Sequence, residues 1–91
     1  MSLQKRKGSG TLSAKDRAIP VNFVYDVFPD QSMFQIRGQI FCEDFETMFN
    51  WHQSAIKLTL TTEDFSLELY LSDDRGGFTA TGGPIHRKQN G

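Results

Sequence analysis

Residues 55–72, AIKLTLTTEDFSLELYLS, contain the clearest structural pattern in the sequence. Apolar and polar residues alternate on both sides of Glu63 and Asp64, and a period of two places all the apolar residues on one face of a strand. The apolar positions are Ile56, Leu58, Leu60, Phe65, Leu67, Leu69 and Leu71. The segment is therefore predicted to be a β-hairpin with one buried face and one solvated face.

The same spacing predicts how the two strands of this hairpin pair. Loops of two and of four residues both align the apolar positions, as Leu60 with Leu67, Leu58 with Leu69 and Ile56 with Leu71. A loop of odd length would need a bulge, or it would turn one set of leucines outward. The Glu-Asp pair suits a two-residue type I′ turn poorly, because neither residue takes positive φ readily. We therefore expect the four-residue loop 62–65.

Two strands are predicted before the central hairpin. Apolar residues alternate over residues 21–27 and again over 34–40, and Pro-Asp-Gln-Ser at 29–32 is a typical turn sequence between them. A four-residue loop there pairs Phe23 with Gly38, so that the aromatic ring covers the glycine. These two strands should form a second hairpin.

A further strand is predicted after the central hairpin. A four-residue loop at 73–76 brings Phe78 opposite Leu71 and Ala80 opposite Leu69. The last three strands of the chain should therefore form a meander.

One short helix is predicted over residues 43–52, where the alternation stops. Four residues share a helical stripe at i, i+3, i+4 and i+7, namely Phe45, Met48, Phe49 and His52. Asp44 is suited to be the N-cap, and Glu46 in the first turn matches the helix dipole. Trp51 lies off the stripe. We expect the stripe to pack on the sheet, because so short a helix is not stable alone.

The predicted fold is α+β, a small, mostly antiparallel sheet of order β-β-α-β-β-β with one short helix. A β-grasp-like sheet and a small five-stranded barrel are the alternative arrangements. All eleven aromatic residues fall between Phe23 and Phe78, so residues 20–83 should form the single domain. Residues 1–19 are predicted to be a disordered basic arm and 84–91 a polar basic tail.

Charge is unevenly distributed along the chain. Residues 1–19 carry a net charge of +4, residues 20–83 carry −7 and residues 84–91 carry +2, which sum to the overall −1. An acidic body repels phosphate, so a nucleic-acid partner would have to engage the basic tails.

The cysteine and hydropathy patterns favour a cytoplasmic protein. Cys42 is the only cysteine, which excludes an intrachain disulfide and fits a reducing compartment. No apolar run approaches the length of a membrane span or forms a signal peptide, so no membrane partner is expected.

A metal site can be drawn from Cys42, His52 and His86 with Glu43 and Asp44, but no pair has the spacing of a zinc motif. Cys42 instead continues the inward-facing positions of its strand, and free cysteine is commonly buried. We therefore predict no metal and no cofactor.

Two other segments have a simple structural interpretation. The adjacent carboxylates Asp73 and Asp74 lack the alternating pattern of a calcium loop and suit an exposed turn. Arg-Gly-Gly-Phe at 75–78 resembles one unit of an RNA-binding RGG repeat, but it occurs once. No nucleophile motif is present, and a non-enzymatic protein is favoured over a small enzyme subunit.

An unusually apolar second face is predicted on the first hairpin. It carries Val24, Phe28, Met33 and Phe41. A domain of this size buries only about 60% of its unfolded surface, so dimerisation is a common supplement. The face should be covered by the helix or by a second copy in a homodimer.

Aromatic and acidic residues together predict a surface that binds a protein partner. Trp51 and Tyr70 are the expected anchors, because Trp and Tyr are typical hot-spot residues. The expected steering charges are Glu43, Glu46, Asp73 and Asp74. The predicted function is a non-enzymatic protein-binding module of the small inhibitor, immunity or adaptor type. Nucleic-acid binding through the basic N- and C-terminal arms is the alternative.

Overall fold

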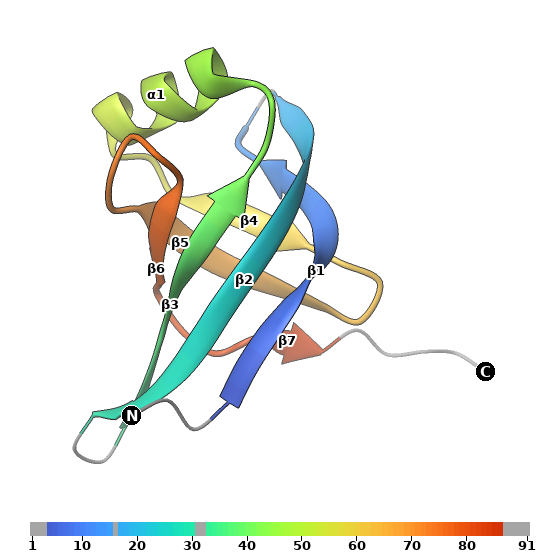
Figure 1. Cartoon of the computed structure of the whole chain (residues 1–91), viewed down its shortest axis with the longest axis vertical. Coiled ribbons are helices and arrows are strands. Elements are labelled where there is room, and N and C mark those ends of the chain that lie inside the picture. The colour runs from blue at the N-terminus through green and yellow to red at the C-terminus, as the bar shows by residue number, and fades with distance from the viewer. Residues whose placement is uncertain (1–3, 16, 31–32, 87–91) are drawn as a thin grey trace.

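The computed structural model shows strands wrapped into an antiparallel barrel, with a helix across one end (Figure 1). It describes residues 4–15, 17–30 and 33–86. The strands are β1 (Gln4–Ser13), β2 (Ala18–Asp30), β3 (Met33–Phe41), β4 (Leu58–Thr61), β5 (Phe65–Leu71), β6 (Gly77–Ala80) and β7 (Ile85–His86). The helix α1 (Phe45–Ser54) connects β3 to β4. The fold is thus a small antiparallel β structure with one short helix, as predicted, and the sheet is closed.

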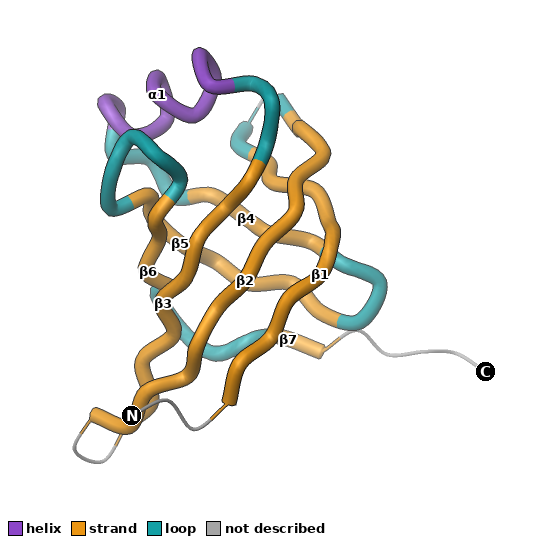
Figure 2. The backbone as a smooth tube through the Cα atoms, in the orientation of Figure 1, coloured by secondary structure: helices purple, strands orange, loops and turns teal. Residues whose placement is uncertain are grey.

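Closure of the barrel follows from the strand pairing. The sheet runs β4-β1-β2-β3-β6-β5-β7, and an additional pairing of β4 with β5 closes six of these strands into a ring (Figure 2). All the pairings are antiparallel, and closure leaves fewer unpaired strand edges than an open sheet. Of the two predicted alternatives, the five-stranded barrel is closer to the structure than the β-grasp-like sheet, but the closed ring has six strands.

The central hairpin has the predicted register. Leu58 pairs with Leu69 and Leu60 with Leu67, and all four side chains are buried in the barrel. The loop 62–65 is closed by a hydrogen bond of 2.8 Å from the Thr62 N–H to the Phe65 carbonyl.

The outermost pair of this hairpin is not formed. Ile56 was expected opposite Leu71, but β4 begins only at Leu58 and Ile56 is exposed. The strand after the hairpin agrees with prediction, since β6 places Phe78 opposite Leu71 and Ala80 opposite Leu69.

The hairpin of β2 and β3 differs from the predicted register by two residues. Tyr25, not Phe23, lies opposite Gly38, because pairing continues through Pro29 to the pair of Asp30 with Met33. Residues 29 and 30 of the predicted turn are thus paired with β3, residues 31 and 32 lie outside the described residues, and the hairpin extends past the end of the barrel (Figure 1). A shift of two preserves the face on which each side chain lies.

The N-terminal segment is a strand where we expected a disordered arm. Leu12 and Ile19, which look isolated in the sequence, are both buried in the core. They were overlooked because Gly8 and Gly10 occupy the preceding inward positions of β1 and conceal the alternation. A Cβ on Gly8 would lie 3.2 Å from the Phe23 ring, so the glycine leaves room for that ring. The folded region therefore includes residues 4–13 and extends to β7.

The helix has the predicted N-cap but buries a different face. Thr47, Met48 and Trp51 are buried, whereas Phe45 and Phe49 are 72% and 47% exposed. Trp51 has the largest side chain in the helix, and the helix docks on the barrel end with Trp51 buried. Phe45 and Phe49 are left exposed in this orientation. Of the predicted stripe Met48 is buried as expected, whereas Phe45 and Phe49 were wrongly assigned to the buried side. Among the described residues no helix could span a membrane.

Candidate protein-binding site

Three exposed phenylalanines lie together where β3 meets α1. Phe41, Phe45 and Phe49 are 52%, 72% and 47% exposed. Phe45 and Phe49 are four residues apart and so neighbour each other on one side of the helix. Phe41 and Phe45 line one small pocket. We call these three residues the phenylalanine patch, and contiguous exposed apolar surface of this kind marks interaction sites.

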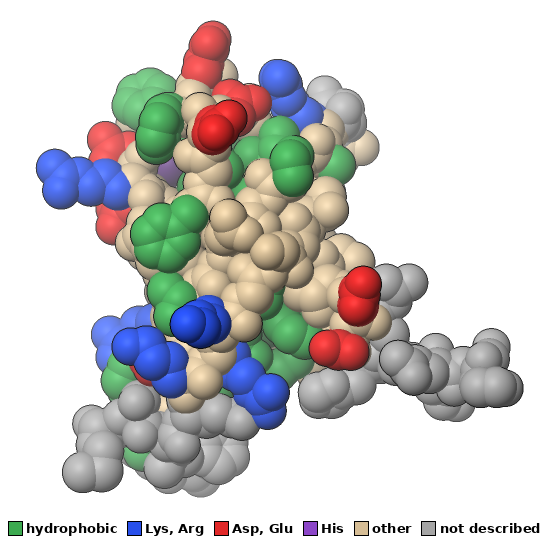
Figure 3. All heavy atoms as spheres, turned by 45° about the vertical axis from the view of Figure 1, so that its right-hand side comes forward, with side chains coloured by type: hydrophobic (Ala, Val, Ile, Leu, Met, Phe, Trp, Pro, Cys, Tyr) green, Lys and Arg blue, Asp and Glu red, His purple; other side chains and the backbone are tan. Residues whose placement is uncertain are grey.

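Acidic side chains border the phenylalanine patch. Glu43 and Glu46 are exposed and alternate in sequence with its residues, and Asp73 and Asp74 are exposed in the β5–β6 turn. We call these four residues the acidic rim. Figure 3 shows hydrophobic and acidic side chains side by side at the end of the molecule that carries α1. Of these four residues Asp74 lines the pocket, where Arg75 also lies, so a partner that covers the patch meets more negative than positive charge.

The pocket in the patch lies between α1 and the β5–β6 turn. It has a volume of about 130 Å³. Its lining residues are Ile40, Phe41, Cys42, Phe45, Met48, Asp74 and Arg75. A shallow groove of about 520 Å³ starts at Phe41 and Cys42 and follows the outside of β1 and β2 past Ser9 and Asn22. The two hollows suit an apolar side chain and the extended segment that carries it.

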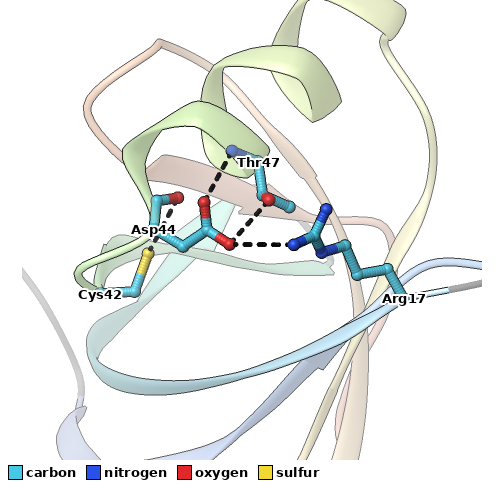
Figure 4. Close-up of polar contacts among 4 residues, drawn as sticks. All are labelled: Arg17, Cys42, Asp44 and Thr47. Carbon is cyan, nitrogen blue, oxygen red and sulfur yellow. Dashed lines mark hydrogen bonds and ion pairs between the residues drawn. The ribbon is translucent and has the colours of Figure 1, made fainter.

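Asp44 caps the helix at its start (Figure 4). Phe45 is the next residue, so this cap also fixes the position of its backbone. Its carboxylate accepts hydrogen bonds from the Thr47 N–H at 3.0 Å and from the Thr47 hydroxyl at 2.8 Å. A guanidinium nitrogen of Arg17 lies 3.6 Å from the same carboxylate. These donors, with the backbone N–H of Thr47 first, hold the pKa of Asp44 below its usual value.

Asp73 organises the turn that carries half of the acidic rim. Its Oδ1 accepts hydrogen bonds from the backbone N–H groups of Arg75 at 2.8 Å and of Gly77 at 2.9 Å. These bonds lower the pKa of Asp73, and the turn also needs Gly76, whose φ is +97°. The side-chain amide of Gln39 donates to the Arg75 carbonyl. The turn is thus fastened to β3, and its charges have a fixed place beside the helix.

The two predicted aromatic anchors have different surroundings. Trp51 is 7% exposed and belongs to the core, so it is not available as an anchor for a partner. Tyr70 is 40% exposed on the outer face of β5, opposite Thr79 of β6, and does not line the pocket. The prediction missed Phe45 and Phe49 because it placed both on the buried stripe.

The described residues of the predicted self-association face lie in different surroundings. Val24 and Phe28 are half-buried on the outside of β2, and Phe28 lies under the guanidinium of Arg37 at 4.6 Å. Phe41 belongs to the phenylalanine patch, and the side chain of Met33 lies outside the described part of the structure. The helix does not cover this face, because it lies across the barrel end (Figure 1).

Residues that could ligate a metal are dispersed. The part of the chain that the structure describes holds no group of three His, Cys, Asp or Glu side chains able to bind an ion. The thiol of Cys42 is half-buried and donates to the Asp44 carbonyl at 3.7 Å. Burial raises its pKa, so the reactive thiolate is disfavoured. His86 was the third candidate ligand, and its side chain lies outside the described part.

Comparison with protein-family models, with curated proteins and with solved structures gives no match to this chain.

Proposed function

We propose that the protein is a non-enzymatic binding module that holds a basic protein segment against the phenylalanine patch. The observation that carries the proposal is the exposure of three phenylalanines at the junction of β3 and α1, with Glu43 and Glu46 exposed in the same segment and Asp74 lining the pocket. Exposed aromatic residues cost solubility, and their cluster is explained if a partner covers them. We place this activity in the cytoplasm, because Cys42 has no second cysteine with which to pair.

The acidic rim and the patch have separate parts in the proposed binding. The carboxylates attract a basic segment and accelerate the encounter, an effect that salt weakens. The phenylalanines then provide most of the affinity, since burying one such side chain fully is worth about 1.5–3 kcal/mol. An apolar side chain of the partner enters the pocket between Phe41 and Phe45. Binding in this way occludes the basic surface of the partner.

The test is a screen of surface-displayed 12-residue peptides against the purified chain, compared between variants. We expect enriched peptides to combine Lys or Arg with one apolar residue. F45S/F49S should reduce their binding at least tenfold, and E43Q/E46Q should slow association and weaken its salt dependence.

The matched control is Ile85→Ser, because Ile85 is 63% exposed and lies on β7 away from the patch. This variant should bind the enriched peptides as the parent does. The proposal fails if F45S/F49S and Ile85→Ser have equal effects, or if the enriched peptides are not basic.

A further inference from the structure

We propose that the outer face of β1, β2 and β3, at the end of the barrel away from α1, binds single-stranded nucleic acid through Lys5, Lys7, Arg37 and Phe28. Figure 3 shows several basic side chains gathered at this end, whereas acidic side chains cluster with apolar and a few basic ones at the end that carries α1. The surface is separate from the phenylalanine patch and would act independently of it.

The strand register places the three cations on one face. Lys5 pairs with Asp26 and Lys7 with Val24 across β1 and β2, and Arg37 pairs with Asp26 across β2 and β3. Paired residues point to the same side of a sheet. The buried residues of these strands point inward, so these three cations point outward, and all three are exposed.

The spacing of the cations suits an extended polyanion. Lys5 and Lys7 are two residues apart on β1, which separates their Cα atoms by about 7 Å. Arg37 lies two strands away from Lys5, at about 10 Å. Within the described part of the chain none of the three forms an ion pair. Their charges are therefore available to phosphates.

Arg37 and Phe28 add a stacking surface between the strands. The guanidinium lies over the Phe28 ring at 4.6 Å from its centre, which holds a flat cationic group against the barrel wall. Bases of single strands stack on such aromatic and guanidinium planes, whereas the bases of a duplex are already stacked on one another. The face therefore favours a single strand.

An anionic membrane is the competing ligand, and the apolar residues argue against it. Val24 and Phe28, the apolar side chains that the structure describes on this part of the face, are half-buried and so offer little surface to insert between lipids. The carboxylate of Asp26 lies between Lys5 and Arg37 and reduces the net charge of the face. This carboxylate should lower the affinity of the face for any polyanion. Its removal in the variant Asp26→Asn should therefore tighten binding.

The experiment is fluorescence anisotropy of the full chain with a labelled 15-nucleotide poly-dT strand, its duplex with poly-dA, and vesicles of phosphatidylserine and phosphatidylcholine. For three phosphate contacts on a single strand, the slope of log K against log salt should be about −2. Affinity for the single strand should therefore fall about twentyfold between 50 and 200 mM NaCl. The duplex and the vesicles should bind more weakly than the single strand.

Four variants assign the binding to this face. K5Q/K7Q should reduce the salt slope to about −0.7, and Asp26→Asn should raise affinity severalfold. Arg37→Lys keeps the charge and should weaken binding through lost stacking while the salt slope is unchanged. Lys15→Gln is the matched control, because Lys15 is an exposed cation just past the other end of β1, and it should change little.

The inference is overturned if K5Q/K7Q and Lys15→Gln weaken binding equally, or if Asp26→Asn has no effect. It is overturned as well if the vesicles or the duplex bind as tightly as the single strand. F45S/F49S should leave nucleic-acid binding unchanged, so failure of this site and failure of the proposed protein-binding site are distinguishable. Circular dichroism of each variant confirms that the comparison is between folded proteins.

Discussion

Leu12 of β1 lies directly opposite Leu60 of β4, and both side chains are completely buried. This pair belongs to a contact of three residues on each strand, Thr11–Ser13 with Thr59–Thr61, without which the ring of six strands would be open. This contact joins the first strand of the chain to its central hairpin, although the two are far apart in the sequence. Bringing them together costs chain entropy, which the burial of these side chains must offset.

Leu12→Ala should destabilise the protein by about 2–5 kcal/mol, because it leaves a cavity at the closure. Deletion of residues 1–13 should abolish cooperative unfolding, whereas a disordered arm could be removed without effect. Urea denaturation followed by circular dichroism measures both, with the exposed Ile85→Ala as the control. An unchanged midpoint for the deletion would contradict the role of β1 in the barrel.

Gly38→Ala should also destabilise the protein, by about 1–3 kcal/mol, because the position is overpacked. An added Cβ would lie 2.2 Å from the Val24 carbonyl oxygen and 2.8 Å from the Phe78 ring. Gly82→Ala is the matched control, since nothing lies within 4 Å of its added Cβ. Equal thermal midpoints for the two variants would show that the space around Gly38, between β2 and β3, can accommodate a methyl group.

The parts of the fold that were predicted correctly are those specified by local alternation. The pair of Leu58 with Leu69 follows from a period of two and a loop of even length. The missed strand β1 has glycines at two inward positions, so its identity depends on partners distant in the sequence, such as the Phe23 ring over Gly8. No periodicity within residues 1–19 reveals those partners.

The sequence predicts Glu43, Glu46, Asp73 and Asp74 as steering charges, and all four are exposed. It did not predict Phe45 and Phe49 as exposed aromatic residues. The face of the helix was misassigned, because Phe45 and Phe49 make a more apolar stripe than Thr47 and Trp51. Docking against the barrel decides which stripe is buried, and that is a property of the whole fold.

Stability should decrease as the pH falls below about 4, through Asp44 and Asp73. Hydrogen bonds lower the pKa of each in the folded state, relative to an unfolded value near 3.9. The stabilisation is therefore complete above that unfolded value and is lost as the pH falls through the lower folded pKa values.

The double variant D44N/D73N tests this pH dependence. Asparagine does not titrate, and its single oxygen can still accept the Thr47 N–H bond at position 44 and both N–H bonds at position 73. Urea midpoints measured from pH 6 to pH 2 should fall less steeply for the variant than for the parent. Parallel curves would mean that other groups cause the acid sensitivity.

Trp51 fluorescence should report a buried side chain. As the only tryptophan, and only 7% exposed, it should emit at shorter wavelength in the folded chain than in urea, and iodide should quench it weakly. The comparison is a W51F/Y70W variant, which moves the tryptophan to a position that is 40% exposed and should be quenched strongly. Strong quenching of both would restore Trp51 as a surface anchor.

Substitutions on the buried side of α1 should affect stability, whereas substitutions on its exposed side should affect binding. Met48→Ala removes a side chain that is 3% exposed and should cost about 2–5 kcal/mol of stability. Phe45→Ser and Phe49→Ser change exposed positions, so each should alter stability by no more than about 0.5 kcal/mol. Thermal unfolding of the three variants, beside their affinity for a basic peptide from the screen, gives the two readouts. Because the residues share one helix, a large loss of stability in the serine variants would mean that the phenylalanines pack against the barrel, and the patch would not be a free surface.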